Sequence, residues 1–140
     1  HFINQSLNFV VRKCEHLIST KNGTRAIYID SYNKEQILNY INRDERHRIK
    51  FQYISDIILG GHRNTSVYDK EDISEKCKNV TAMKFFKGQE NDRIYCKEIH
   101  SAKGTFIVIT SILHERKKNS RLSAREVTII EKVGGYQYEI

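Results

Sequence analysis

Basic side chains gather at the ends of three predicted strands in the second half of the sequence. Residues 83–99 read MKFFKGQENDRIYCKEI, and after a short turn residues 104–130 read GTFIVITSILHERKKNSRLSAREVTII. Cations at or near the ends of adjacent strands of one sheet indicate a phosphate ligand, because positive charge and N–H donors are what bind a phosphate. The side chains concerned are those of Lys84, Lys87, Arg93, His114, Arg116, Lys117 and Lys118.

The net charge of the chain, +7, is concentrated in one segment. Between His114 and Arg125 five basic residues stand against a single acid, Glu115, so +4 of the net charge lies there. Concentrated positive charge is informative about a partner, whereas an evenly basic surface is not. The alternative interpretation is a solvated loop and helix start whose cations serve solubility. The position at a strand end favours the first interpretation.

The first half of the sequence predicts a helix, then one strand, then a hairpin of two helices. Apolar residues at spacings of three and four over 2–18 predict an N-terminal amphipathic helix, which forms an extension over 1–23. A β-prone run at 24–30 predicts the first strand of a core over 24–140. Asn33 and Gln36 then predict a capping box that opens a hairpin of two helices, which ends at Gly60 and Gly61.

The second half predicts a meander closed by a helix. Residues 62–79 are expected to form an irregular connection with room for one helical turn. Three antiparallel strands are expected at 80–86, 93–99 and 105–113, with Gly88 and Asn91 in the first connection. Ser123 and Glu126 predict a capping box for a last helix that ends at Gly134-Gly135, and the tail YQYEI adds an edge strand or packs loosely. Residues 1–140 are therefore expected to form one α+β domain.

Several classes of function lack support in the sequence. No apolar run is long enough to span a membrane, and three cysteines without a CxxC spacing fit a reducing cytoplasm. No glycine-rich nucleotide motif occurs, so no cofactor is expected. His47 and His62 lack a second ligand at metal spacing, and no metal is expected. The acids of 69–75 are interpreted as a solvated loop, or as a shield for the basic face.

The order of elements and the local sequence resemble the RelE/HigB-like toxins of type II toxin-antitoxin systems. The stretch MKFFKGQENDRIYC is similar to that family's strand-turn-strand, in which lysines precede a glycine-containing turn and an arginine opens the next strand. SILHERKKNS resembles its last strand, and SAREVTIIEKV resembles its terminal helix. The resemblance covers about residues 25–138. The chain departs from it in the N-terminal extension, in the long 62–79 connection, and in Glu115-Arg116, where the family has Gly-Phe.

The resemblance implies a β-α-α-β-β-β-α fold with a small antiparallel sheet packed by helices. It also implies a cytoplasmic toxin that cleaves mRNA, often at the ribosome, and that a protein antitoxin inhibits. Relatives similar to ParE act on DNA gyrase without cutting RNA, so a non-catalytic toxin or binding module on the same fold is the alternative. A phage-derived protein in which the fold has only a structural role is a further alternative.

Matching the family's motifs gives each basic residue an expected role. The predicted catalytic residues are Lys84, Arg93, His114 and Lys117. Arg93 is the leading candidate, because a guanidinium holds two phosphate oxygens at once and stays charged. His114 is the candidate proton-transfer group, with Lys84 as its alternative if neighbouring cations lower its pKa. The predicted RNA-binding residues are Lys87, Arg116, Lys118, Arg121, Arg125, Tyr136 and Tyr138.

Two of these roles have an alternative interpretation that the sequence leaves open. The ring of His114 could simply pack at a strand end, without any chemical role. Tyr136 and Tyr138 could belong to the core or to an edge strand, because the chain has eight tyrosines and most of them serve packing.

Overall fold

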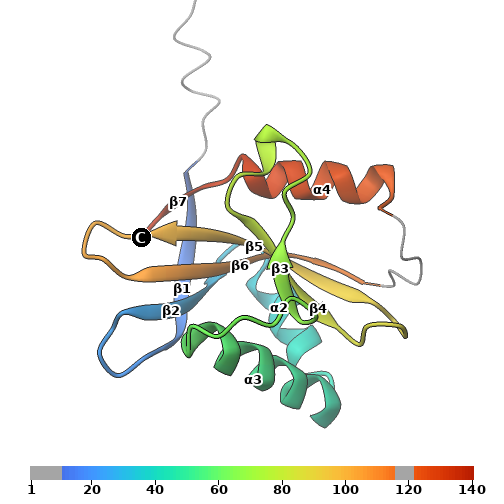
Figure 1. Cartoon of the computed structure of the whole chain (residues 1–140), viewed down its shortest axis with the longest axis horizontal. Helices are drawn as coiled ribbons and strands as arrows, with labels where there is room; N and C mark the ends of the chain where they lie inside the picture. Colours follow the sequence, from blue (N-terminus) through green and yellow to red (C-terminus); the bar gives the residue numbers. More distant parts are fainter. Residues whose placement is uncertain (1–10, 116–121) are drawn as a thin grey trace, which may run out of the picture.

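The computed structural model describes residues 11–115 and 122–140, which form an α+β fold around a seven-stranded sheet with strand order β3-β4-β5-β6-β2-β1-β7. Helices α2 and α3 cover one face of this sheet, and α4 covers the other (Figure 1). The elements in chain order are β1 (Val11–Ser19), β2 (Arg25–Asp30), α2 (Lys34–Ile41), α3 (Glu45–Leu59), β3 (Tyr68–Lys70), the 3₁₀ turn η1 (Glu75–Cys77), β4 (Val80–Phe85), β5 (Asp92–His100), β6 (Phe106–His114), α4 (Ala124–Gly134) and β7 (Gln137–Glu139).

The predicted class is right, but the predicted β-α-α-β-β-β-α order and the small antiparallel sheet are wrong. Strand β1 precedes the first predicted strand, and β3 lies inside the 62–79 connection. The tail forms β7 at the edge of the sheet, which confirms the edge-strand alternative. The sheet is also mixed, since β2 pairs with β6 and β1 with β7 in parallel. Strands of three residues such as β3 and β7 are too short to show an alternation of apolar and polar residues.

The predicted N-terminal helix is wrong over its described part, because residues 11–19 form β1. This strand pairs with β2 through a turn in which Asn22 Oδ1 accepts from the Thr20 and Thr24 hydroxyls at 2.8 and 2.7 Å. The register of the pair shifts between His16 and Ile18, and Leu17 and Ile18 both pack on the α2/α3 side. A β-bulge places neighbouring residues on one face. The bulge therefore accounts for the adjacent apolar pair Leu17 and Ile18 at the end of the spacing that resembles a helix.

The predicted capping box at Asn33 and Gln36 is also absent. Asn33 precedes α2, but its side chain makes no capping hydrogen bond. The Asn33 amide group donates instead to the backbone carbonyl of Ser111 at 2.8 Å, which ties the start of α2 to β6. The predicted Ser123/Glu126 capping box is present at α4, with both of its hydrogen bonds. The residue types at both helix starts fit a capping box, and tertiary contacts determine which of the two boxes forms.

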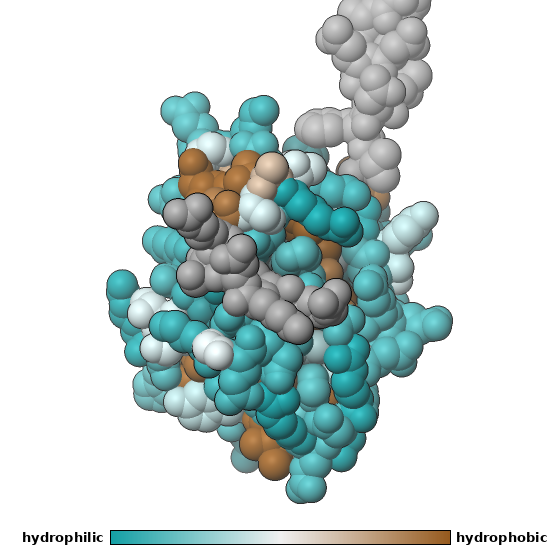
Figure 2. Space-filling model, turned by 90° about the vertical axis from the view of Figure 1, so that its right-hand side faces the viewer, coloured by the Kyte–Doolittle hydropathy of each residue, from teal (hydrophilic) through white to brown (hydrophobic). Residues whose placement is uncertain are grey.

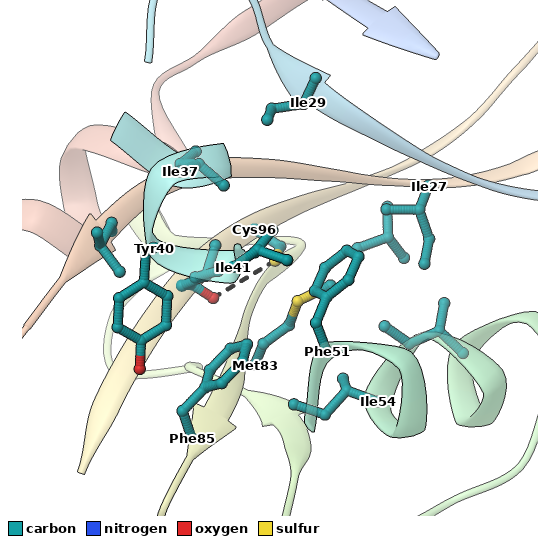
Figure 3. Packing of buried hydrophobic residues seen from close by; sticks show 14 of the residues in the cluster. Ile27, Ile29, Ile37, Tyr40, Ile41, Phe51, Ile54, Met83, Phe85 and Cys96 are labelled. Carbon is teal, nitrogen blue, oxygen red and sulfur yellow. Dashed lines mark hydrogen bonds between the residues drawn. The ribbon is translucent and has the colours of Figure 1, made fainter. Parts of the chain in front are cut away.

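The core lies between the sheet and the α2/α3 pair. Isoleucines of β2, α2 and α3 pack there against Met83 and Phe85 of β4 and Cys96 of β5 (Figure 3). The rings of Tyr40 and Phe85 meet edge to face, with centroids 5.3 Å apart. A smaller cluster on the opposite face joins Ile130 and Val133 of α4 to β4 and β5. Among the described residues, no helix has the length and apolar character that crossing a membrane requires.

Candidate functional site

Three of the predicted catalytic residues occupy neighbouring positions on three adjacent strands. Lys84 of β4 is paired with Arg93 of β5, and Arg93 is paired with His114 of β6. Directly opposed residues of antiparallel strands point to the same face, with Cβ atoms about 5 Å apart. We call Lys84, Arg93 and His114 the cationic row.

The cationic row lies on the face that α4 covers. The next paired row along the same strands consists of Ala82, Tyr95 and Ile112. Ala82 and Tyr95 belong to the cluster that packs beneath α4, with Ile112 packed against it. Side chains two residues apart in a strand share a face, so the cationic row follows directly on this packed row, toward the β4–β5 hairpin and the beginning of α4. Figure 2 shows that side of the molecule, where hydrophilic residues cover most of the surface.

The β4–β5 hairpin sets Lys84 opposite Arg93. Its connection contains three left-handed residues, Phe86 (φ 56°), Gly88 (φ 82°) and Asn91 (φ 56°). The Asn91 side chain accepts a hydrogen bond from the Gly88 backbone N–H at 2.7 Å, which holds the turn. Asparagine tolerates this backbone region, but a bulky residue such as Phe86 adopts it only when the surroundings require it. The arginine stack on Phe86, with Arg46 Cζ 3.5 Å from the ring centroid, supplies such surroundings.

A β-bulge in β6 brings His114 onto the same face. Tyr95 pairs with Ile112 and Cys96 pairs with Thr110, so β6 has one extra residue, Ser111, between these pairs. Without the extra residue, His114 would follow the alternation of Thr110 and point toward the α2/α3 core. The bulge therefore completes the cationic row.

Two nitrogen atoms of the Arg93 guanidinium are buried without a hydrogen-bond partner in the described part of the chain. Its Nε and Nη1 atoms are shielded from solvent, and neither has a partner among the described residues. Burying a charged donor without a partner is unfavourable, so native structures retain such groups mainly where a ligand or a functional constraint requires them. A phosphate would satisfy both N–H groups at once.

Lys84 lies at the β3 end of the row. Its Nζ donates to the Thr65 backbone carbonyl at 3.1 Å and lies 3.8 Å from Asp69 Oδ2. Burial lowers the pKa of Lys84, the charges of Arg93 and Lys87 lower it further, and Asp69 and Glu71 oppose the shift. Desolvation and like charges both disfavour the ammonium form. Lys84 is therefore closer than an ordinary lysine to serving as a proton acceptor.

Behind Arg93, β5 is joined to the first turn of α4. The Tyr95 hydroxyl donates to Glu126 Oε2 at 3.2 Å, while Oε1 of the same carboxylate accepts from the Ser123 backbone and hydroxyl. Burial and the nearby Glu126 raise the pKa of Tyr95. Tyr95 therefore stays a neutral donor that fixes the position of α4 over the row.

Glu115, where the resembling family has glycine, forms an ion pair. Its Oε1 lies 2.7 Å from Arg43 Nη2 in the turn between α2 and α3. Arg43 also stacks over Tyr40, with Cζ 4.9 Å from the ring centroid. Glu115 thus joins the end of β6, next to His114, to the turn between α2 and α3.

The other predicted basic residues either lie beside the cationic row or fall outside the described residues. Lys87 is exposed in the β4–β5 connection, and Arg125 is exposed in the first turn of α4. Both lie next to elements that carry the row. Arg116, Lys117, Lys118 and Arg121 lie outside the described residues.

Tyr136, just before β7, and Tyr138 of β7 lie in a different cluster, at the β1/β7 edge of the sheet. The Tyr138 hydroxyl is 2.7 Å from Asp30 Oδ2 and 2.8 Å from Ser111 Oγ. Arg12 binds the same buried carboxylate with two N–H groups, at 2.7 and 3.0 Å, and stacks 4.1 Å above the Tyr136 ring. Burial raises the pKa of both tyrosines. These contacts favour the packing interpretation over the RNA-binding one.

Removing the Tyr138 hydroxyl should destabilise the protein. In Tyr138→Phe the buried Asp30 carboxylate loses a donor, and hydrogen bonds to charged groups contribute about 1.5–3 kcal/mol. We expect urea denaturation to show a loss of about that size. Tyr32→Phe is the matched control, because Tyr32 is 87 % exposed, and it should leave the unfolding midpoint unchanged. Equal midpoints for both variants would contradict this assignment.

Sequence reasoning missed Thr65, whose backbone carbonyl accepts from Lys84. It left open whether Asp69 belongs to a solvated loop or shields the basic face, and the 3.8 Å distance from Asp69 Oδ2 to Lys84 Nζ favours the shield. Asp69 reaches the row because the three-residue β3 pairs it with Ala82 on the same face. In residues 11–115 and 122–140, no three His, Cys, Asp or Glu side chains converge as metal ligands would. The expectation of a metal-free site stays a prediction.

Comparison of the chain with protein-family models, with curated proteins and with solved structures found no match. The functional interpretation therefore depends on the geometry of the cationic row and on the short motifs that form it.

Proposed function

We propose that the chain is a toxin of a toxin-antitoxin system and acts as a metal-independent endoribonuclease on mRNA, at the ribosome. The observation that carries the proposal is the cationic row, with two buried N–H groups of Arg93 unpartnered among the described residues. The resemblance to RelE/HigB-like toxins supplies the substrate, the cytoplasmic location and the antitoxin partner. No cofactor enters the proposal.

The row has the groups that cleavage through the ribose 2′-hydroxyl requires. A base removes the 2′-hydroxyl proton, the 2′-oxygen attacks phosphorus, and the bond from phosphorus to the 5′-oxygen breaks as an acid protonates that oxygen. The products are a 2′,3′-cyclic phosphate and a 5′-hydroxyl end. His114 and Lys84 flank Arg93 on either side, so one is available for each proton transfer.

Arg93 has a separate task, which is to stabilise the transition state. The phosphorane formed by the attack carries extra negative charge on its non-bridging oxygens. A guanidinium fixed on a strand, with free N–H groups in a site shielded from water, binds this charge without having to reorganise. Lys117 is the fourth proposed catalytic residue, and Arg116, Lys118 and Arg121 extend the proposal to binding of the RNA backbone.

The test is a cleavage assay with purified protein. We expect a single-stranded RNA to be cut to products with 2′,3′-cyclic phosphate and 5′-hydroxyl ends, with the same rate in EDTA as in its absence. In a translation reaction, messages should be shortened at defined positions. The combination His114→Gln with Lys84→Met should remove the rate enhancement from proton transfer, which is typically about 10²–10⁴-fold. Intact RNA under all of these conditions would refute the proposal.

A non-catalytic toxin or binding module on the same fold, such as a ParE-like gyrase inhibitor or a phage-derived protein, is the second candidate. The contacts of Lys84 favour it, because the Thr65 carbonyl and Asp69 already hold the ammonium group. Cell toxicity with intact RNA would select this candidate.

A further inference from the structure

Ser111, the extra residue of the β6 bulge, is fully buried. A bulge leaves one residue outside the regular ladder of the sheet, and a backbone carbonyl without a partner in the interior costs free energy. Solvent cannot supply that partner here, because Ser111 has no exposed surface. Other residues must therefore bind the polar groups of the bulge.

Asn33, in the turn before α2, binds the backbone of the bulge. Its amide group donates to the Ser111 carbonyl at 2.8 Å. The same side chain makes no capping hydrogen bond to α2, although it stands at the start of that helix. The Asn33 amide thus stabilises the bulge in β6 rather than its own helix.

The buried carboxylate of Asp30 fixes the position of Asn33. Asp30 ends β2, and its Oδ1 accepts from the Asn33 backbone N–H at 2.9 Å. Arg12 donates two hydrogen bonds to the same carboxylate, at 2.7 and 3.0 Å. Hydrogen bonds between charged groups are stronger than those between neutral groups. The turn from β2 to α2 is therefore held in the conformation that directs the Asn33 amide to β6.

A second connection from Asp30 reaches the side chain of Ser111. The Tyr138 hydroxyl donates to Asp30 Oδ2 at 2.7 Å and lies 2.8 Å from Ser111 Oγ. Because the carboxylate takes the phenol proton, Ser111 Oγ donates to the phenol oxygen or to the Ile109 carbonyl, which is 3.0 Å away. The carbonyl and the hydroxyl of Ser111 thus both contact residues that Asp30 holds.

We propose that Asn33 is a positioning residue for the proposed cleavage, because it holds the bulge that turns His114 toward the cationic row. The inference rests on the proposed function and adds to it a residue that acts only through His114. In the register of Cys96 with Thr110, Arg93 would stand opposite Leu113, and the bulge is what replaces Leu113 by His114.

Hydrogen exchange of backbone amides tests the bulge without any need for RNA cleavage. In Asn33→Ala the protected amides of residues 111–114 should exchange about 5–10-fold faster, which corresponds to the net contribution of one hydrogen bond. The amides of β4 should keep their rates, because β5 lies between β4 and the bulge. Asn39→Ala removes an exposed asparagine of α2 and should change neither segment. Unchanged exchange at 111–114, or equal acceleration in β4, would overturn the inference.

Cleavage kinetics identify the group through which Asn33 acts. Asn33→Ala should lower the single-turnover rate at saturating RNA about 10–100-fold, because a small displacement of a proton-transfer group is costly. In a chain that already carries His114→Gln it should have no further effect, because the group that it positions is absent. A role confined to the stability of α2 would lower the rate by the same factor in both chains. Such an equal loss would contradict the proposal.

The two experiments separate this inference from the proposed function. Intact RNA would refute the nuclease, and the exchange rates would still decide whether Asn33 holds the bulge. Cleaved RNA with unchanged exchange at 111–114 would leave the nuclease standing and refute the role of Asn33. If Asn33→Ala fails to fold, Asn33→Ser takes its place, because serine suits a helix start but is too short to reach the Ser111 carbonyl.

Discussion

Replacing Arg93 by alanine is expected to lower the rate of RNA cleavage about 10³-fold or more, as the loss of a transition-state arginine or of oxyanion donors does. The reason is the position of the guanidinium in the middle of the cationic row, with Nε and Nη1 unpartnered among the described residues. Single-turnover cleavage of a labelled RNA measures the effect. Arg93→Lys should recover only part of the rate, because an ammonium keeps the charge but lacks the two-pronged geometry.

The matched control for this loss is Arg48→Ala. Arg48 is an exposed arginine of α3, on the helical pair that covers the opposite face of the sheet, and its removal changes the net charge equally. Its cleavage rate should stay within about two-fold of the unchanged chain, since a distant surface charge acts only through screened electrostatics. Normal cleavage by Arg93→Ala would exclude the proposed phosphate clamp.

Replacing Arg93 is expected to raise the stability of the protein even though it abolishes cleavage. A buried charge without partners costs free energy in the folded state, and an apolar side chain of similar length removes that cost. Arg93→Met should therefore raise the free energy of unfolding by about 1–3 kcal/mol while abolishing cleavage. Urea denaturation of the two proteins measures the difference. A variant less stable than the unchanged chain would show that the guanidinium serves the fold rather than a ligand.

Gly134→Ala is expected to lower the free energy of unfolding by more than Tyr138→Phe does. A Cβ atom at this position would lie 1.8 Å from the Lys76 carbonyl oxygen and 2.8 Å from its carbon, both of them backbone atoms of η1. Relief requires α4 to separate from η1, which would also break the hydrogen bond from Lys97 Nζ to the Gly134 carbonyl. We expect the free energy of unfolding to fall by about 3 kcal/mol or more.

The neighbouring glycine provides the control. At Gly135 the nearest atom to an added Cβ is the Lys132 carbonyl oxygen at 3.6 Å, and φ is −84°, which any residue adopts. Gly135→Ala should leave stability unchanged or raise it by up to about 1 kcal/mol, because alanine restricts the unfolded chain. Thermal unfolding of the two variants side by side gives the comparison. Similar melting temperatures for the two variants would show that η1 moves away from α4 at little cost in free energy.

The parts of the fold that the sequence predicts depend on local signals. Gly88 and Asn91 mark the β4–β5 connection, and the structure has both at positive φ with Lys84 opposite Arg93. Ser123 and Glu126 mark the start of α4, where both capping hydrogen bonds form. In each case the deciding contacts join residues a few positions apart, so the residue types alone indicate the geometry.

The parts that the sequence does not predict depend on distant contacts. Leu17 and Ile18 have helical spacing, but a bulge against β2 makes them neighbours on one face of a strand. Asn33 has the composition of a helix cap, but the Ser111 carbonyl, 78 positions away, takes its side chain. The contact between Asp69 and Lys84 was hidden for the same reason, since it forms only through the pairing of β3 with β4. Tertiary structure overrides local preference at each of these positions.

The parallel pairing of β2 with β6 has a consequence for the order of folding during synthesis. Arg25 pairs with Phe106, so the middle of the sheet cannot close until β6 has been synthesised, and β1 meets Gln137 later still. Pairings so distant in sequence form slowly, since the entropy of closing a long loop is lost before any contact is gained. The pairing of Arg93 with His114 lies within the local β5–β6 hairpin, so the cationic row can assemble before the middle of the sheet closes.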